Sequence, residues 1–275
     1  MQFSLIVSPP LQDHGPGFSV RSIDWHALGH PASPVIQLDH FRVSGTPFGP
    51  HPHAGFCAVT YVLRDSPGGL RSRDSLGNDI MVGPGGIVWT QAASGLLHHE
   101  LPAQPGRELQ GLQFFVNLHA SQKLGDPQVL WLDGWRVPMW RSDAGDDVRV
   151  VVGAFRDAIS PLQTVEPFTL LDIDLTDGLA LAASPEGCGV IYLLSGDIQL
   201  QTGDQTQTLG ASQALAVIGG GELRLAARRP SRLIYMSGAR IDEPTMAVGP
   251  FLMNTQQQID DAMRRYHSGA MGRLK

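Results

Sequence analysis

Two short runs of metal-ligating side chains, His51-Pro52-His53 and His98-His99-Glu100, are the chemically most informative part of this chain. In an extended strand, residues i and i+2 point to the same face. His51 and His53 would then share one face of their strand, and His98 and Glu100 one face of theirs. On neighbouring strands, these four side chains would offer three imidazoles and one carboxylate to a single divalent transition metal. Such an ion keeps room for a substrate if it is six-coordinate.

The residues around the two runs favour strands. Ten histidines in 275 residues would give about a third of one His-x-His pair by chance, so neither run is informative alone. The first run leads into Ala58-Val59-Thr60-Tyr61-Val62-Leu63, and the second follows Gly86-Ile87-Val88-Trp89-Thr90. Both stretches are rich in β-branched and aromatic residues, and Pro52 suits a strand start or edge. Surface or core histidines are the alternative, and the strand context favours a metal site.

The composition predicts an all-β protein. Charged residues make up 17% of the chain, which contains 32 glycines and 20 prolines, and short apolar runs alternate with turn residues. A net charge of -6 and a pI near 5.9 argue against direct nucleic-acid binding through electrostatics. They leave a protein partner open.

The two cysteines and the start of the chain bear on the compartment. Cys57 and Cys188 lie far apart and predict no disulfide framework, which favours a reducing setting. The first ten residues lack the basic start and the long apolar run of a signal peptide, and no stretch reaches transmembrane length. We therefore expect a cytoplasmic protein that is not associated with a membrane.

A weak internal repeat predicts two consecutive β-barrel domains, residues 1–137 and 138–275. Tyr61-Val62-Leu63 resembles Tyr192-Leu193-Leu194, and later strand-like runs correspond in the same way. No histidine occurs between His119 and His267, so only the first domain can hold the metal. An N-cap near Thr255 and apolar residues at helical spacing predict a short C-terminal helix at about 255–267.

The ordered motifs of this chain resemble those of the pirin family, within the cupin superfamily. The matching stretches run almost from end to end: Leu38-Asp39-His40-Phe41, His51-Pro52-His53-Ala54-Gly55-Phe56, Val59-Thr60-Tyr61-Val62-Leu63, Arg73-Asp74-Ser75-Leu76-Gly77-Asn78, Leu97-His98-His99-Glu100-Leu101-Pro102, 111–118 and Gly249-Pro250-Phe251-Leu252-Met253-Asn254-Thr255. The resemblance implies a bicupin with one metal in its N-terminal barrel. It also implies that iron is held by His51, His53, His98 and Glu100.

The chain departs from the family pattern next to the first ligand run. Where the family has His-Pro-His-Arg-Gly-Phe-Glu-Thr, Ala54 replaces the arginine and Cys57-Ala58 replace the glutamate and threonine. Strand parity predicts that Cys57 lies on the ligand face, where a thiol would stand in place of a carboxylate and alter the surroundings of the ligands. The alternative is that Cys57 is a small buried apolar residue. The replacements bear on substrate and activity more than on metal binding.

The ligand set and the resemblance lead to three functional hypotheses. The resemblance favours Fe(II), whereas the residue types also suit Mn, Co, Ni, Cu or Zn. In the first hypothesis the protein is a dioxygenase of quercetinase type, acting with O2 on a flavonol or a similar enol or phenolic substrate. Glu100 is then the catalytic base, or it is purely a ligand. The second is a non-catalytic, iron-dependent interaction protein or transcriptional coregulator, and the third is another cupin enzyme such as an isomerase. Both barrels lie in one chain, so we expect a monomer.

Other histidines and aromatic residues carry weaker expectations. His99 should point away from the ligand face, and His40 more simply satisfies a turn or the core. Trp89, Phe114 and Phe48 could line the mouth of a pocket, although aromatic residues in a barrel are more often core residues.

Overall fold

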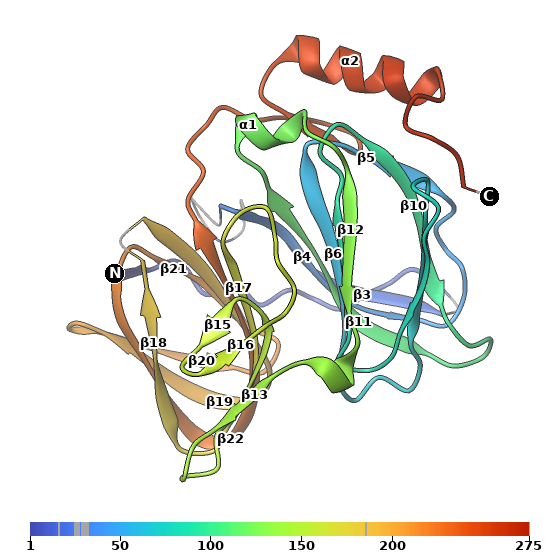
Figure 1. The fold of residues 1–275 in the computed structure, drawn as a ribbon. Coiled ribbons are helices and arrows are strands. Elements are labelled where there is room, and N and C mark those ends of the chain that lie inside the picture. Colours follow the sequence, from blue (N-terminus) through green and yellow to red (C-terminus); the bar gives the residue numbers. More distant parts are fainter. Residues whose placement is uncertain (16, 25–27, 29–32, 185, 275) are drawn as a thin grey trace. The chain divides into compact units, whose positions relative to one another are not determined.

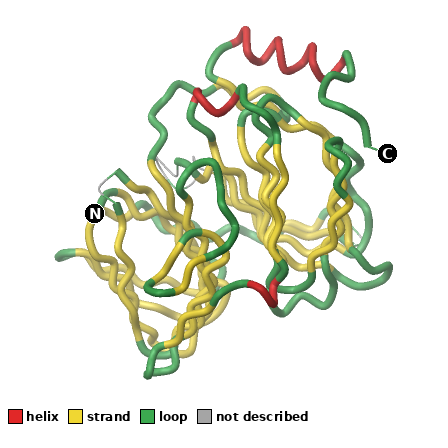
Figure 2. Tube along the Cα trace, in the orientation of Figure 1, coloured by secondary structure: helices red, strands yellow, loops and turns green. Residues whose placement is uncertain are grey.

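The computed structural model describes residues 1–15, 17–24, 28, 33–184 and 186–274. Within these residues the chain is mostly β-strand, as predicted, with the predicted C-terminal helix and a second, short α-helix that was not predicted (Figure 1, Figure 2). It divides into two compact units. The histidine unit consists of Leu11–Ser22, Leu38–Arg136 and Ile241–Lys275, and the second unit consists of Met1–Pro10, Ile23–Gln37 and Val137–Arg240.

The bounds of these compact units differ from the predicted domains, 1–137 and 138–275, at both ends of the chain. Strand β1 (Gln2–Phe3) pairs with β21 (Ala214–Ile218), so the first residues belong to the second unit. The C-terminal helix α2 (Gln256–His267) belongs to the histidine unit. Pairing and packing between segments more than 200 residues apart decide both assignments, and a local repeat carries no information about them.

The histidine unit is built from a four-stranded and a seven-stranded antiparallel sheet, in the orders β5-β10-β7-β8 and β12-β9-β6-β11-β4-β3-β2. Apolar side chains of both sheets form one buried core, which includes Leu70 and Leu96 from the first and Val62 and Leu109 from the second. The strands are β2 (Gln12–Asp13), β3 (Phe18–Asp24), β4 (Val35–Val43), β5 (His51–His53), β6 (Phe56–Val62), β7 (Leu70–Asp74), β8 (Asp79–Val82), β9 (Ile87–Gln91), β10 (Leu96–Pro102), β11 (Leu109–Asn117) and β12 (Gln128–Leu132). The end of β3 (23–24) and the start of β4 (35–37) are assigned to the second unit.

Short elements complete this unit: helix α1 (Ala120–Lys123), a 3-10 turn (Gly134–Arg136) and the hairpin of β23 (Met246–Val248) and β24 (Phe251–Met253). Helix α2 begins with a capping box in which the Thr255 side chain accepts from the Gln258 backbone and the Gln258 side chain accepts from the Thr255 backbone. Ile259 and Ala262 of α2 are buried in an apolar cluster with β24. The predicted helix is therefore confirmed.

The second unit is built from one large antiparallel sheet, in the order β1-β21-β19-β22-β17-β14-β13 with β18 and β20 paired to its two longest strands, and a separate hairpin of β15 and β16. Its interior is filled with aliphatic side chains such as Leu171, Ile191 and Leu233. Its other elements are β13 (Met139–Arg141), β14 (Asp147–Val152), β15 (Ala154–Phe155), β16 (Ala158–Ile159), β17 (Phe168–Leu175), β18 (Gly178–Ala183), β19 (Gly187–Thr202), β20 (Gln205–Gly210) and β22 (Gly221–Ala239).

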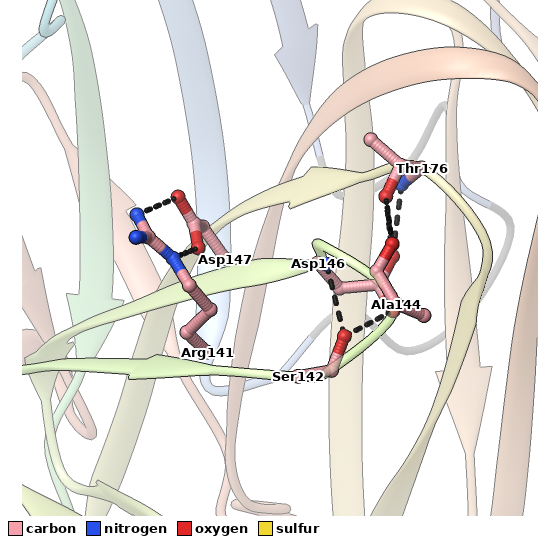
Figure 3. A network of polar contacts seen from close by, with 6 residues as sticks. All are labelled: Arg141, Ser142, Ala144, Asp146, Asp147 and Thr176. Carbon is pink, nitrogen blue, oxygen red and sulfur yellow. Dashed lines mark hydrogen bonds and ion pairs between the residues drawn. The ribbon is translucent and has the colours of Figure 1, made fainter.

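A polar network closes the turn between β13 and β14 in the second unit (Figure 3). The carboxylate of Asp146 accepts from the backbone of Thr176 at 2.8 Å and of Asp177 at 3.0 Å, and from the hydroxyl of Ser142 at 3.0 Å. Burial alone would raise the pKa of Asp146, but these hydrogen bonds hold that pKa below its usual value. Beside it, Arg141 and Asp147 form a two-point ion pair. This network ties the turn to the loop after β17.

Candidate metal centre

Strands β5 and β10 bring the three predicted histidine ligands together. The two strands pair antiparallel, with His51 opposite His98 and His53 opposite Leu96, and they lie side by side in Figure 1. One ring nitrogen from each of His51, His53 and His98 lies within 4.8 Å of the others. The i, i+2 relation and the antiparallel register together account for this convergence.

The ring nitrogens are placed as ligands of one ion. His51 Nδ1 donates to the carbonyl oxygen of Gly49 at 2.9 Å, which leaves Nε2 to face His98 Nε2 at 3.1 Å. Two imidazole nitrogens about 2.1 Å from a metal, at right angles, would be about 3 Å apart. Buried His53 Nε2 has no hydrogen-bond partner. A divalent transition metal fits this set of donors.

Burial keeps the imidazoles in the neutral form that binds metals. Loss of hydration, followed by the proximity of His51, lowers the pKa of His53 to about 3. Burial likewise lowers the pKa of His98 well below its usual value, and His53 and His51 add to the effect. Both rings are therefore unprotonated near neutral pH, and a metal ion would not compete with protons at these two positions.

Glu100 lies on the same face of β10 as His98, but its carboxylate is held by other groups. Oε2 accepts from the hydroxyl of Thr60 at 2.6 Å and from the amide of Gln113 at 3.3 Å, while buried Oε1 has no hydrogen-bond partner. Burial raises the pKa of Glu100 to about 7, and the polar side chains of Thr60, Ser72 and Gln113 partly oppose that rise. The three-residue cluster that fits a metal does not include Glu100. Its role as the fourth ligand stays a prediction.

Thr60 and Gln113 are functional candidates that the sequence reasoning missed. They are direct partners in the pairing of β6 with β11, and both side chains reach Glu100. Each is a polar residue within an otherwise apolar strand run, and such a residue, when buried, needs a partner. A polar residue within an apolar run is therefore the sequence feature that could have identified Thr60 and Gln113.

The prediction that Cys57 lies on the ligand face is wrong. Parity from His53 fails because β5 ends at His53 and β6 begins at Phe56, with Gly55 between them at φ 87°. On β6, Thr60 reaches the interior carboxylate, so Cys57, three residues earlier, points to the opposite face. Cys57 is 1% exposed and is not among the clustered ligand residues. Cys57 is therefore a small buried residue, as the alternative interpretation of the sequence held.

Two contacts fix the chain where it leaves the ligand strand. A Cβ atom added at Gly55 would lie 1.9 Å from the carbonyl oxygen of Leu252, so only glycine allows this approach. The buried ammonium of Lys123 donates to the carbonyl oxygens of Gly55 at 2.7 Å and Leu252 at 2.9 Å, and to Asn117 Oδ1 at 2.6 Å. Lys123 therefore links β24 to the end of the ligand strand.

A small cavity of about 90 Å³ is lined by Glu100 and Gln113 among mostly apolar residues. Of the three aromatic residues considered for a pocket mouth, only Phe48 lines this cavity. Trp89 and Phe114 are 2% and 0% exposed and belong to the interior.

His99 and His40 are outside the ligand cluster, and for His99 this agrees with the prediction from strand parity. Within the described residues, neither α-helix is long and apolar enough to span a bilayer.

Comparison with known proteins identifies the family. The pirin family model matches residues 21–116, and the model of the pirin C-terminal cupin domain matches residues 170–272. Human pirin is 30% identical over 271 residues, covering 95% of this chain and 90% of its own length. A Pseudomonas aeruginosa protein provisionally named quercetin 2,3-dioxygenase is 32% identical, covering 93% and 92%. The chain therefore belongs to the pirin family.

Solved structures show the same cupin architecture. A quercetin 2,3-dioxygenase from Acinetobacter baumannii aligns with a TM-score of 0.85 at 24% identity, covering 98% of both chains. The bacterial pirin YhhW from Escherichia coli, solved in complex with nickel(II), aligns with a TM-score of 0.66 at 18% identity, covering 86% of this chain and 100% of its own. At these identities the likeness establishes the fold.

Proposed function

We propose that this pirin-family cupin is a metal-dependent dioxygenase of quercetinase type that acts with O2 on a phenolic or enolic substrate. The observation that carries the proposal is the combination of three converging imidazoles with a buried carboxylate whose pKa is near 7. A group with that pKa can accept and return a proton near neutral pH. A curated relative and a solved structure similar to this chain are both named quercetin 2,3-dioxygenase, the former provisionally, and these names support the same chemistry.

The chain's own residues divide into ligands and a proton-handling group. His51, His53 and His98 would hold the ion, with Fe(II) as our first choice, and Glu100 would either join them or stay at the cavity. When bound, the metal supplies Lewis acidity that lowers the pKa of a substrate hydroxyl. Glu100 Oε1, which has no other partner, would accept the hydroxyl proton. Thr60 and Gln113 hold Oε2 and so fix the orientation of the carboxylate.

Oxygen uptake tests this proposal. Protein loaded with Fe(II) is mixed with a panel of phenols and enols that includes a flavonol, and O2 consumption is recorded for wild type and Glu100→Ala. We expect uptake with at least one substrate and a loss of at least 100-fold in the variant, the usual scale for a general base. If no substrate consumes O2, and a specific protein partner is captured in both metal states, the protein is instead an interaction protein.

A further inference from the structure

The cavity beside Glu100 is too small for a flavonol. It encloses about 90 Å³, whereas an engineered cavity of about 150 Å³ accepts benzene and sites for drug-sized ligands enclose about 300–1,000 Å³. One six-membered ring can therefore enter only by extending partly through the opening. A fused bicycle carrying a further phenyl ring would leave most of its volume outside the cavity, beyond the opening.

Aromatic side chains form one wall of this cavity and part of its opening. Phe18 on β3, Phe41 on β4 and Phe48 in the following loop all line it. The rings of Phe18 and Phe48 meet edge to face with centroids 5.1 Å apart, and Phe48 is 53% exposed. The ring of His14 stacks on the Phe18 ring, with centroids 5.4 Å apart. A flat ring suits such a wall, and the Phe18–Phe48 pair limits its size.

The charges of the lining select against anionic ligands. Asp39 and Glu100 are the ionisable residues among those that line the cavity, and neither arginine nor lysine lines it. Away from the ion, the protein lining offers no opposite charge to replace the hydration that a ligand carboxylate or phosphate would lose. An uncharged phenol or enol, by contrast, can donate its hydroxyl to Glu100 and accept from the amide of Gln113.

We propose that this cavity admits single-ring, uncharged phenols and enols in preference to flavonols and carboxylated phenols, and that Phe48 and Phe18 set the size limit. The assignment rests on the proposed function, because it takes the molecule in the cavity to be the substrate oxidised at the histidine cluster. None of the three histidines lines the cavity, and the link between the two is Glu100, which lines it and lies two residues from His98 on β10. It narrows that function to a smaller class of substrate than the relatives' names state.

Binding of matched probes to the Co(II)-loaded protein, measured without O2, tests the proposal. The first pair is 3-hydroxypyran-4-one, which carries the enol and carbonyl of a flavonol on one ring, against 3-hydroxyflavone. The second pair is catechol against 3,4-dihydroxybenzoate. We expect the smaller or uncharged member of each pair to bind at least tenfold more tightly. Metal-free protein measures probe binding that does not depend on the ion.

Phe48→Ala should reduce the tenfold preference for the single ring to threefold or less, because it opens the mouth. Phe48→Leu serves the same purpose if the alanine variant does not fold, as judged by circular dichroism. The control is Leu76→Ala, which truncates an exposed side chain that does not line the cavity, and it should keep the wild-type ratio. Wild-type protein that binds 3-hydroxyflavone as tightly as the single ring, or a ratio unchanged by Phe48 variants, would overturn the proposal.

Oxygen uptake separates this inference from the proposed function. Ring selectivity without O2 uptake by any bound probe would contradict dioxygenase activity and leave the assignment of the cavity standing. Uptake with flavonols and none with single-ring substrates would contradict the assignment of the cavity and support the broader function.

Discussion

Replacing the buried carboxylate Glu100 by its neutral isostere should stabilise the metal-free protein at alkaline pH. Burial raises the pKa of Glu100 from 4.5 to about 7, because the charged form loses its hydration in the interior. In Glu100→Gln the side chain keeps its shape and can still accept from Thr60, but it cannot ionise. The variant therefore removes the cost of a buried charge and little else.

The expected magnitude follows from proton linkage. A displacement of the pKa from 4.5 to about 7 corresponds to about 3 kcal/mol. Because the folded pKa lies above the unfolded one, this contribution to stability is fully present below the unfolded pKa and is lost as the pH rises through the folded pKa. Roughly 2.5 kcal/mol of that loss develops between pH 5 and pH 8. The two lowered histidine pKa values are common to both proteins and cancel in the comparison.

The assay is urea unfolding of wild type and Glu100→Gln in the presence of a chelator, at pH 5 and pH 8. We expect the difference in the free energy of unfolding to shift by about 2.5 kcal/mol in favour of the variant between pH 5 and pH 8. If Glu100 is the fourth ligand, as the sequence predicts, adding Co(II) should reverse the order, because only the wild type then gains a carboxylate ligand. Glu108→Gln, at a half-buried carboxylate of the same unit, is the matched control and should show neither effect. A Glu100→Gln difference that does not change with pH would refute the argument.

Three further substitutions test contacts that stabilise the two units. Lys123→Met removes one donor from each of three buried acceptors, of which Asn117 Oδ1 still accepts from the Leu118 backbone, so it should lower the free energy of unfolding by roughly 2–4 kcal/mol in urea titrations, and calorimetry should show weaker Co(II) binding. Gly55→Ala should lower the melting temperature severely because of its backbone clash, whereas Gly49→Ala, with no atom within 4 Å of an added Cβ, should change it little. Asp146→Ala should cost about 1–3 kcal/mol in urea unfolding, unlike Asp143→Ala at the exposed neighbour. Equal effects of Gly55→Ala and Gly49→Ala, or of Asp146→Ala and Asp143→Ala, would contradict the structural roles given to Gly55 and Asp146.

Much of the metal centre could be predicted because it depends on local geometry. The i, i+2 spacing of His51 and His53 places both rings on one face whatever the rest of the fold does. Helix α2 was predictable for the same kind of reason, since Thr255 and Gln258 form their capping box within four residues. The family resemblance then supplied the cupin architecture, which periodicity alone would have left as an unspecified β-barrel.

The sequence stops being informative about side-chain positions and domain bounds where local periodicity ends. The parity argument for Cys57 assumed one continuous strand, and the positive φ of Gly55 breaks it. The predicted domain boundaries assumed that neighbours in sequence fold together, whereas β1 pairs with β21 and α2 packs in an apolar cluster with Ala54 and Leu97. Nor does spacing show that Glu100 is held by Thr60 and Gln113, because that contact depends on the register of three strands.

Titration of metal-free protein with Co(II), followed through the visible absorption bands of the bound ion, measures whether the three histidines form one metal site. We predict one saturable Co(II) site per chain in the wild type, no saturable site in His98→Ala, and wild-type behaviour in His99→Ala, whose side chain points to the other face of β10. Wild-type affinity in His98→Ala, or equal losses in both variants, would contradict a metal centre built from His51, His53 and His98.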